Sequence, residues 1–108
     1  MTTILDHLQS ISRDLDTAIT ELKTLEMNAA EAESAYRVAK AVAFMKAEGP
    51  VQAREHQAVI DTQVELIERD KTAAMTRVQI QYIKSLHARI DVGRTVASAE
   101  RLLAGVVT

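Results

Sequence analysis

The N-terminal half of the chain carries a long heptad repeat of apolar residues without any helix-breaking residue. Neither glycine nor proline occurs between Thr2 and Glu48. Throughout this segment apolar residues follow one another at alternating gaps of four and three, which places them along one side of an α-helix, as in a coiled coil. This N-terminal seam consists of Ile4, Leu8, Ile11, Leu15, Ala18, Leu22, Leu25, Ala29, Ala32, Tyr36, Ala39 and Ala43. The pattern predicts one helix over residues 3–48, and Thr3 with Asp6 predicts a variant of the capping box at its start.

The composition of the N-terminal seam changes along its length. Its first half consists mainly of isoleucine and leucine, whereas alanine dominates from Ala29 onward. Small side chains allow helix axes to approach closely. We therefore expect tight helix packing towards residue 48 and a thicker, leucine-rich core at the other end.

Gly49 and Pro50 predict a turn in the middle of the chain. Glycine commonly follows the last residue of a helix, and proline fits the first turn of the next one. The segment from Val51 to Val92 again lacks both residues and predicts a second helix over residues 51–92. Its apolar residues occupy more than one line, which favours contact with more than one neighbour. One line comprises Met75, Val78, Tyr82 and Leu86, and another comprises Ile80, Ile83 and Ile90.

The segment after Gly93 keeps helical spacing of its apolar residues. It predicts a helical extension over residues 94–104 that either continues the second helix or forms a short third one. The sequence thus predicts an all-α protein with a single domain over residues 1–108, built as a long antiparallel helical hairpin of the coiled-coil type. Its 108 residues agree with one domain.

A lone helical hairpin buries one apolar line and leaves the others in water. The little apolar surface that it buries offsets the loss of conformational entropy on folding poorly. We therefore expect a homo-oligomer, either a dimeric four-helix bundle or a larger assembly. The residues predicted to form the packing or oligomer seam are Ile4, Leu8, Ile11, Leu15, Leu22, Leu25, Tyr36, Val78, Tyr82 and Leu86.

The sequence offers no candidate for catalysis, a cofactor or a metal. It has no cysteine, and its three histidines are isolated from any metal-ligand pattern. The three glycines lie far apart, so none belongs to a phosphate-binding loop. The serines lack a neighbouring histidine and aspartate in a nucleophile motif. We expect a protein that is not an enzyme.

Basic residues without acidic neighbours occupy the second half of the chain. From Lys71 to Ile90 no aspartate or glutamate occurs, and the basic set is Lys71, Arg77, Lys84, Arg89, Arg94 and Arg101. Such a set could follow a phosphate backbone. We favour a structural role over nucleic-acid binding: a hairpin would place the basic residues beside Asp14, Asp16, Glu21 and Glu26, followed by Glu31 and Glu33, and this pairing would determine the register of the helices. The net charge of −2 does not select a polyanionic partner.

The sequence contains no membrane-spanning segment. Its longest apolar run covers only residues 41–45, whereas a span needs roughly 18–20 residues. The first residues lack the basic region and apolar stretch of a secretory signal. We expect a soluble, cytoplasmic protein that makes no membrane contact.

Two segments carry a family resemblance. Residues 31–58 contain a glutamate-rich start, Tyr36, regularly spaced alanines, the Gly49 turn and the pair Arg54–Glu55; residues 86–98 run Leu-His-Ala-Arg-Ile-Asp-Val-Gly-Arg-Thr-Val-Ala-Ser. These segments resemble small helical bacteriophage proteins, in which serine or threonine often stands where this chain has Pro50. The resemblance implies an accessory role beside single-strand annealing or DNA-binding proteins of phage replication and recombination. It brings no catalytic or ligand residue with it.

Three functions are therefore open. The first is a non-enzymatic phage coiled-coil protein that acts through self-association and contact with a phage or host protein. The second is a nucleic-acid-binding accessory of phage recombination or replication, with single-stranded DNA as its partner. The third is an inhibitor of a host or defence protein.

Overall fold

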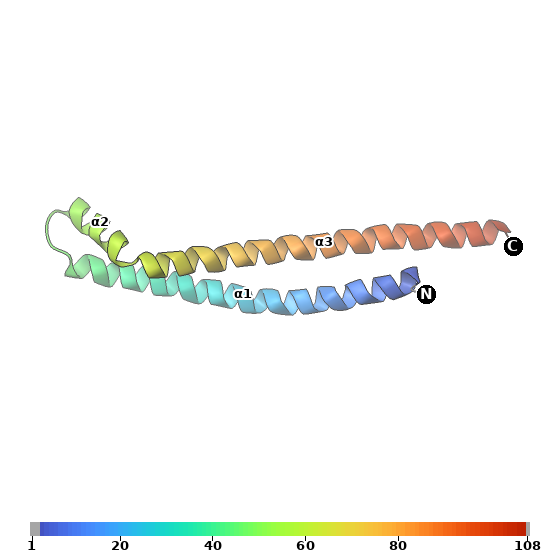
Figure 1. Cartoon of the computed structure of the whole chain (residues 1–108), viewed down its shortest axis with the longest axis horizontal. Helices are drawn as coiled ribbons and strands as arrows, with labels where there is room; N and C mark the ends of the chain where they lie inside the picture. The colour runs from blue at the N-terminus through green and yellow to red at the C-terminus, as the bar shows by residue number, and fades with distance from the viewer. Residues whose placement is uncertain (1–2, 108) are drawn as a thin grey trace. The chain divides into compact units, whose positions relative to one another are not determined.

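The computed structural model describes residues 3–107, which form three helices and contain no β-strand. They are α1 (Ile4–Lys46), α2 (Val51–Asp61) and α3 (Gln63–Val107) (Figure 1). The predicted all-α class is confirmed.

The ends of α1 follow the expected local chemistry. The Asp6 backbone N–H donates to Thr3 Oγ1 at 3.1 Å, and the Thr3 N–H donates to Asp6 Oδ2 at 3.2 Å, so the predicted capping box is confirmed. After Lys46 the chain turns at Gly49, whose φ of 104° is a conformation that favours glycine. Pro50 is the N-cap of α2, and its carbonyl accepts the backbone N–H of Arg54 at 3.0 Å.

The prediction of one helix over residues 51–92 is wrong, because the helix breaks at Thr62. The Thr62 hydroxyl donates to the Ala58 carbonyl at 2.6 Å. The Thr62 backbone N–H donates to the Val59 carbonyl, three residues earlier, instead of the carbonyl four residues earlier as in an α-helix. A threonine that bonds the carbonyl four residues earlier can bend a helix, but Thr20, Thr72 and Thr95 make the same bond inside unbroken helices, so this bond stabilises the break and is not sufficient to cause it. The Gln63 side chain also donates to the Val59 carbonyl, at 2.8 Å. These side-chain bonds supply partners to two carbonyls at the break.

Gly93 does not end the second long helix. It lies inside α3, which continues to Val107, so residues 94–104 extend the helix rather than forming another. Gly93 is buried, and because it has no side chain, Leu8 of α1 can pack directly against it.

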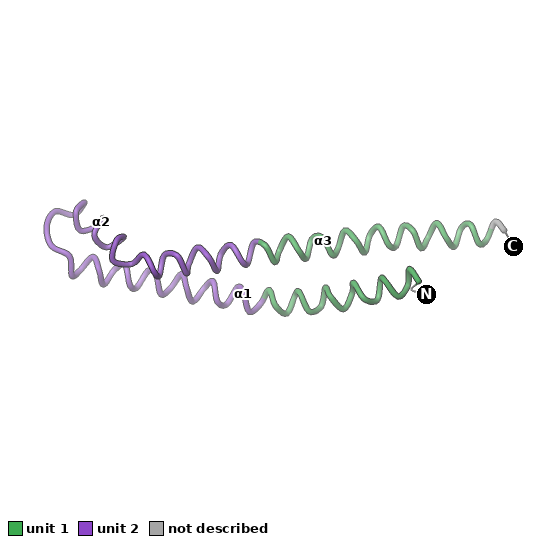
Figure 2. Tube along the Cα trace, in the orientation of Figure 1, with its two compact units in different colours: residues 1–22, 78–108 green, residues 23–77 purple. Residues whose placement is uncertain are grey.

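The chain divides into two compact units, each containing segments of both long helices (Figure 2). Unit 1 comprises residues 1–22 and 78–108, and unit 2 comprises residues 23–77. In unit 1, Leu8 lies beside Gly93, and Ala18, further along α1, lies beside Gln79, which is earlier in α3. In unit 2, Leu25 lies beside Thr76, and Lys40, further along α1, lies beside Glu55, which is earlier in the chain. In each unit, therefore, the two segments run antiparallel.

The face of α2 and α3 that packs on α1 also steps by alternating gaps of four and three. Its members are all buried or half-buried: in unit 2 they are Ala58, Thr62, Glu65, Arg69, Thr72 and Thr76, and in unit 1 they are Gln79, Ile83, Leu86, Ile90, Gly93 and Ala97. We call these residues the C-terminal seam. It is mainly polar in unit 2 and mainly apolar in unit 1.

The predicted seam residues divide into two groups. Those of α1 face inward: Ala18 and Tyr36 are buried, and Ile4, Leu8, Ile11, Leu15, Leu22 and Leu25 are half-buried. Leu86 is 1% exposed, but Val78 and Tyr82, which the sequence placed on its line, are 69% and 43% exposed. Consecutive steps of four rotate a line around the helix, so residues 78, 82 and 86 cannot all stay in a heptad seam.

Candidate interaction surface

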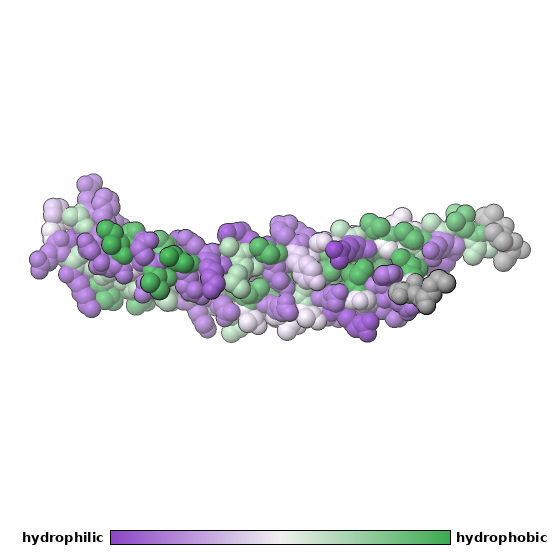
Figure 3. All heavy atoms as spheres, in the orientation of Figure 1, coloured by the Kyte–Doolittle hydropathy of each residue, from purple (hydrophilic) through white to green (hydrophobic). Residues whose placement is uncertain are grey.

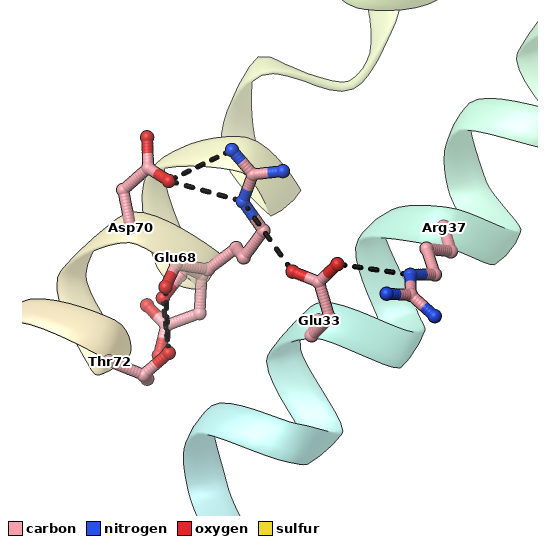
Figure 4. Close-up of polar contacts among 6 residues, drawn as sticks. Glu33, Arg37, Glu68, Asp70 and Thr72 are labelled. Atoms are coloured by element: carbon pink, nitrogen blue, oxygen red, sulfur yellow. Dashed lines mark hydrogen bonds and ion pairs between the residues drawn. The ribbon is translucent and has the colours of Figure 1, made fainter. Parts of the chain in front are cut away.

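A cluster of charged side chains joins α1 to α3 in unit 2 (Figure 4). The Arg69 guanidinium lies 4.5 Å from the centre of the buried Tyr36 ring, and its Nε is 3.7 Å from Glu33 Oε2. Arg37 binds the other oxygen of Glu33 at 3.0 Å, and Asp70 accepts from Arg69 at 3.0 Å. A planar guanidinium can stack on a ring and bond a carboxylate simultaneously. Arg69 thus contacts a ring and a carboxylate of α1 at once, and we call this cluster the Arg69 clamp.

A second cluster joins α2 to the end of α1. The Arg54 guanidinium lies 4.4 Å from the centre of the Phe44 ring and donates to the Phe44 carbonyl at 3.2 Å. Lys40 forms an ion pair with Glu55 at 3.4 Å. These contacts hold the short helix α2 against α1.

Uncharged polar side chains of the C-terminal seam bond the backbone of α1. Thr76 donates to the Leu25 carbonyl at 3.3 Å within unit 2. In unit 1, Gln79 Nε2 donates to the Ala18 carbonyl at 2.9 Å and to Glu21 at 3.3 Å. Ala18 is 1% exposed, and its small side chain allows this approach.

The basic residues of α3 do not form one strip. All six, Lys71, Arg77, Lys84, Arg89, Arg94 and Arg101, are exposed. Residues seven apart lie on one side of a helix, so Arg77 aligns with Lys84, and Arg94 aligns with Arg101 on a different side. Arg94 lines a hollow with Gln9 and Arg13 of α1, whereas Arg89 lines the groove on the other flank of Leu8, with His7 and Ile11.

The expected pairing of these basic residues with the acidic part of α1 is not seen. Within the described residues, the ion pairs that join two helices are Lys40–Glu55 and Arg69–Glu33. Lys71 pairs instead with Glu68 of its own helix, at 3.8 Å. The register of the helices is therefore held by the Arg69 clamp and by the bonds of Thr76 and Gln79.

An exposed line of residues runs along α3 in unit 1, beside the C-terminal seam. It also follows alternating gaps of four and three. Its apolar members are well exposed, from 40% for Val96 to 69% for Val78, and Figure 3 shows hydrophobic side chains at the surface of this part of α3. We call this line the α3 stripe; it consists of Val78, Tyr82, Ser85, Arg89, Val92, Val96, Ala99 and Leu103.

A groove of about 420 Å³ lies between the α3 stripe and α1. The wall from α3 includes Ser85, Arg89, Val92 and Val96, and the wall from α1 consists of Ile4, His7, Leu8 and Ile11. Most of these side chains are apolar. The groove and the stripe together form a continuous surface on one flank of unit 1.

The sequence interpretation missed the polar half of the C-terminal seam, because it counted only apolar residues. The sequence carries no clear signal for it, because six of the seven residues that continue the alternation of Ile83, Leu86 and Ile90 backward to Ala58 are polar.

Among the residues whose positions are described, no group of three or more histidine, aspartate or glutamate side chains could hold a metal ion. Over the same part of the chain, no helix is long and apolar enough to cross a lipid bilayer. No protein-family model, curated protein or solved structure matches the chain.

Proposed function

We propose that this chain is a non-enzymatic, self-associating helical-hairpin protein of a bacteriophage, which acts by protein–protein contact in the host cytoplasm. The observation that carries the proposal is the surface that the chain leaves uncovered. Its accessible area is 8060 Å², whereas a compact protein of 11.9 kDa exposes roughly 5,900 Å².

The uncovered surface is rich in large apolar side chains. The buried apolar residues, among those described, are Ala18, Tyr36, Ala58, Leu86 and Ile90. Well exposed, by contrast, are Leu5, Ile19, Met27, Val38, Val42, Met45, Val51, Ile60, Val64, Ile67, Met75, Val78, Tyr82, Val92, Val96, Leu102 and Leu103. So small a core offsets the loss of conformational entropy on folding poorly. This supports the proposal that the folded chain is bound to a partner, which covers part of the exposed apolar surface.

The partners we propose are a second copy of this chain and, through the assembled surface, a phage or host protein. Inhibition of a host or defence protein would be one form of that contact. The phage origin itself is supported by the resemblance of residues 31–58 and 86–98.

Sedimentation velocity at several protein concentrations tests the proposal. We expect a dimer or larger species whose mass stays constant down to low micromolar concentrations, with helical circular dichroism retained. A folded monomer at every concentration would contradict self-association.

A second candidate function, binding of single-stranded DNA, is supported by one flank of unit 1. Arg13 and Arg94 line the same hollow, and Arg101 lies two helical turns beyond Arg94. Cations in such a row could contact successive phosphates. The matched variants are Arg94→Glu with Arg101→Glu, and Arg77→Glu with Lys84→Glu as the control pair.

Co-sedimentation with a labelled oligonucleotide at two salt concentrations distinguishes the outcomes. A binding site on this flank predicts salt-sensitive binding that the first pair abolishes and the control pair weakens less. Equal loss in both pairs would indicate attraction by overall charge only, and no binding at low salt would eliminate this candidate.

A further inference from the structure

We infer that the α3 stripe is the face on which two copies of this chain pair, with the two α3 helices antiparallel around a twofold axis near residue 87. The inference deepens the proposed self-association and rests on it.

The spacing of the α3 stripe specifies a helical partner. From Val78 to Leu103 the stripe keeps alternating gaps of four and three, the period at which one helix packs continuously along another. The parallel line of the C-terminal seam already contacts α1. A helix with two adjacent heptad lines has two helical neighbours, as in a bundle.

The order of residues within the stripe favours a second copy over an unrelated helix. About residue 87, Val78 is the counterpart of Val96, Tyr82 of Val92, and Ser85 of Arg89. Between Val78 and Val96, apolar residues thus face apolar residues, and polar residues face polar ones, when the helix is paired with itself in the reverse direction. Leu103, at the end of the stripe, has the charged Lys71 as its counterpart and lies outside this self-complementary part. A twofold interface uses the same patch on both copies and needs this self-complementarity.

The polar centre of the stripe and the groove beside it both suit this pairing. One polar layer within an apolar helix interface determines the register. Ser85 and Arg89 would form that layer, because each meets the other across the axis. The groove between the stripe and α1 receives side chains of the partner's α3, so that Leu8 and Ile11 also become covered.

The exposed area agrees with such an interface. The chain exposes roughly 2,000 Å² more than a compact protein of its mass, whereas a homodimer interface of about 2,000 Å² in total needs only about 1,000 Å² from each copy. The uncovered surface is therefore more than sufficient for an interface along the α3 stripe.

The first experiment compares two lysine substitutions at equally exposed valines. Val92 of the stripe is 65% exposed and Val38, on α1 in unit 2, is 62% exposed. We expect Val92→Lys to weaken dimerisation at least about tenfold, since a charge would be buried at the interface, and Val38→Lys to leave it nearly unchanged. Sedimentation equilibrium gives the dissociation constants, and circular dichroism verifies the helix content.

Each outcome of this comparison is decisive. A wild-type chain that is monomeric overturns both the proposed function and this inference. A wild-type dimer that tolerates Val92→Lys, or that Val38→Lys weakens equally, overturns the inference alone and leaves self-association standing.

The second experiment measures the direction of pairing without altering the stripe. The chain contains no cysteine, so Arg77→Cys and Lys84→Cys each provide one site for a spin label outside the stripe. In the antiparallel pair, labels at residue 77 lie about 30 Å apart along the helix axis and labels at residue 84 about 9 Å. Dipolar spectroscopy should therefore give a clearly longer distance at 77, whereas equal distances would indicate a parallel pair and overturn the inference.

Discussion

Gly93 of α3 lies directly against Leu8 of α1, at a position where even one added carbon would collide. A Cβ atom on Gly93 would be 2.5 Å from Leu8 Cδ2 and 3.3 Å from Leu8 Cγ. Glycine in a helix interior costs about 1 kcal/mol relative to alanine. The close packing of Leu8 therefore explains why a helix of this length contains a glycine there.

Substitution of Gly93 should show coupling with Leu8. We expect Gly93→Ala to lower the free energy of unfolding by about 1 kcal/mol, because the cost of overpacking exceeds the gain in helix propensity. In a Leu8→Ala background the collision is absent, and Gly93→Ala should then raise the free energy of unfolding by about 1 kcal/mol. Urea denaturation at one fixed protein concentration measures both. An identical effect in the two backgrounds would show that Leu8 does not restrict position 93.

Thr62 should contribute to stability through its hydroxyl at the helix break. Thr62→Val keeps the shape of the buried side chain but removes its bond to the Ala58 carbonyl, so we expect a loss of about 1 kcal/mol. Thr95 makes the same type of bond, to the Asp91 carbonyl at 3.0 Å, on an exposed and unbroken part of α3. Thr95→Val is therefore the control, with an expected change near zero. Similar losses in both variants would contradict a special role of the break.

The Arg69 clamp should depend on the shape of the guanidinium. We expect Arg69→Lys to cost about 1 kcal/mol, because an ammonium group cannot stack on Tyr36 and bond Glu33 in the same way. Arg37 pairs with the same glutamate but is 75% exposed, so Arg37→Lys should change stability little. Thermal or urea unfolding of both variants tests this, and equal effects would assign the contribution to charge alone.

Gln79 should stabilise the approach of α3 to α1. We expect Gln79→Ala to cost about 1 kcal/mol, since it removes the bonds to the Ala18 carbonyl and to Glu21. Gln81, two residues further along, is exposed and serves as the control for the same substitution. Hydrogen exchange around residue 18 should accelerate in the Gln79 variant only. Unchanged exchange would mean that this bond does not hold the helices together.

Prediction from sequence succeeded where one physical signal dominated. The alternation from Ile4 to Ala43 and the Thr3–Asp6 pair were sufficient for α1, because propensity, periodicity and capping all indicate the same helix. The break at Thr62 was missed because neither glycine nor proline marks it. A threonine can either face solvent or bond the preceding turn, and its surroundings decide which.

The candidate interaction surface was predicted in part. The sequence indicated that the second helix has more apolar lines than one neighbour can cover, and included Val78 and Tyr82 among the residues concerned. It did not separate the line that packs on α1 from the one left exposed. The basic residues form one set along the chain because they are close in sequence, although their spacing distributes them around the helix.

The sequence by itself determined that the chain is helical, where α1 begins and where the chain turns at Gly49, because these depend on interactions among residues near one another in the chain. Only the tertiary structure decided which face of α3 contacts α1. Polar residues such as Thr76 and Gln79 occupy that face because they find backbone carbonyls of α1 to bond, while Val78 and Tyr82 stay exposed. Such a choice depends on the partner surface, and hydrophobicity along a single helix does not contain it.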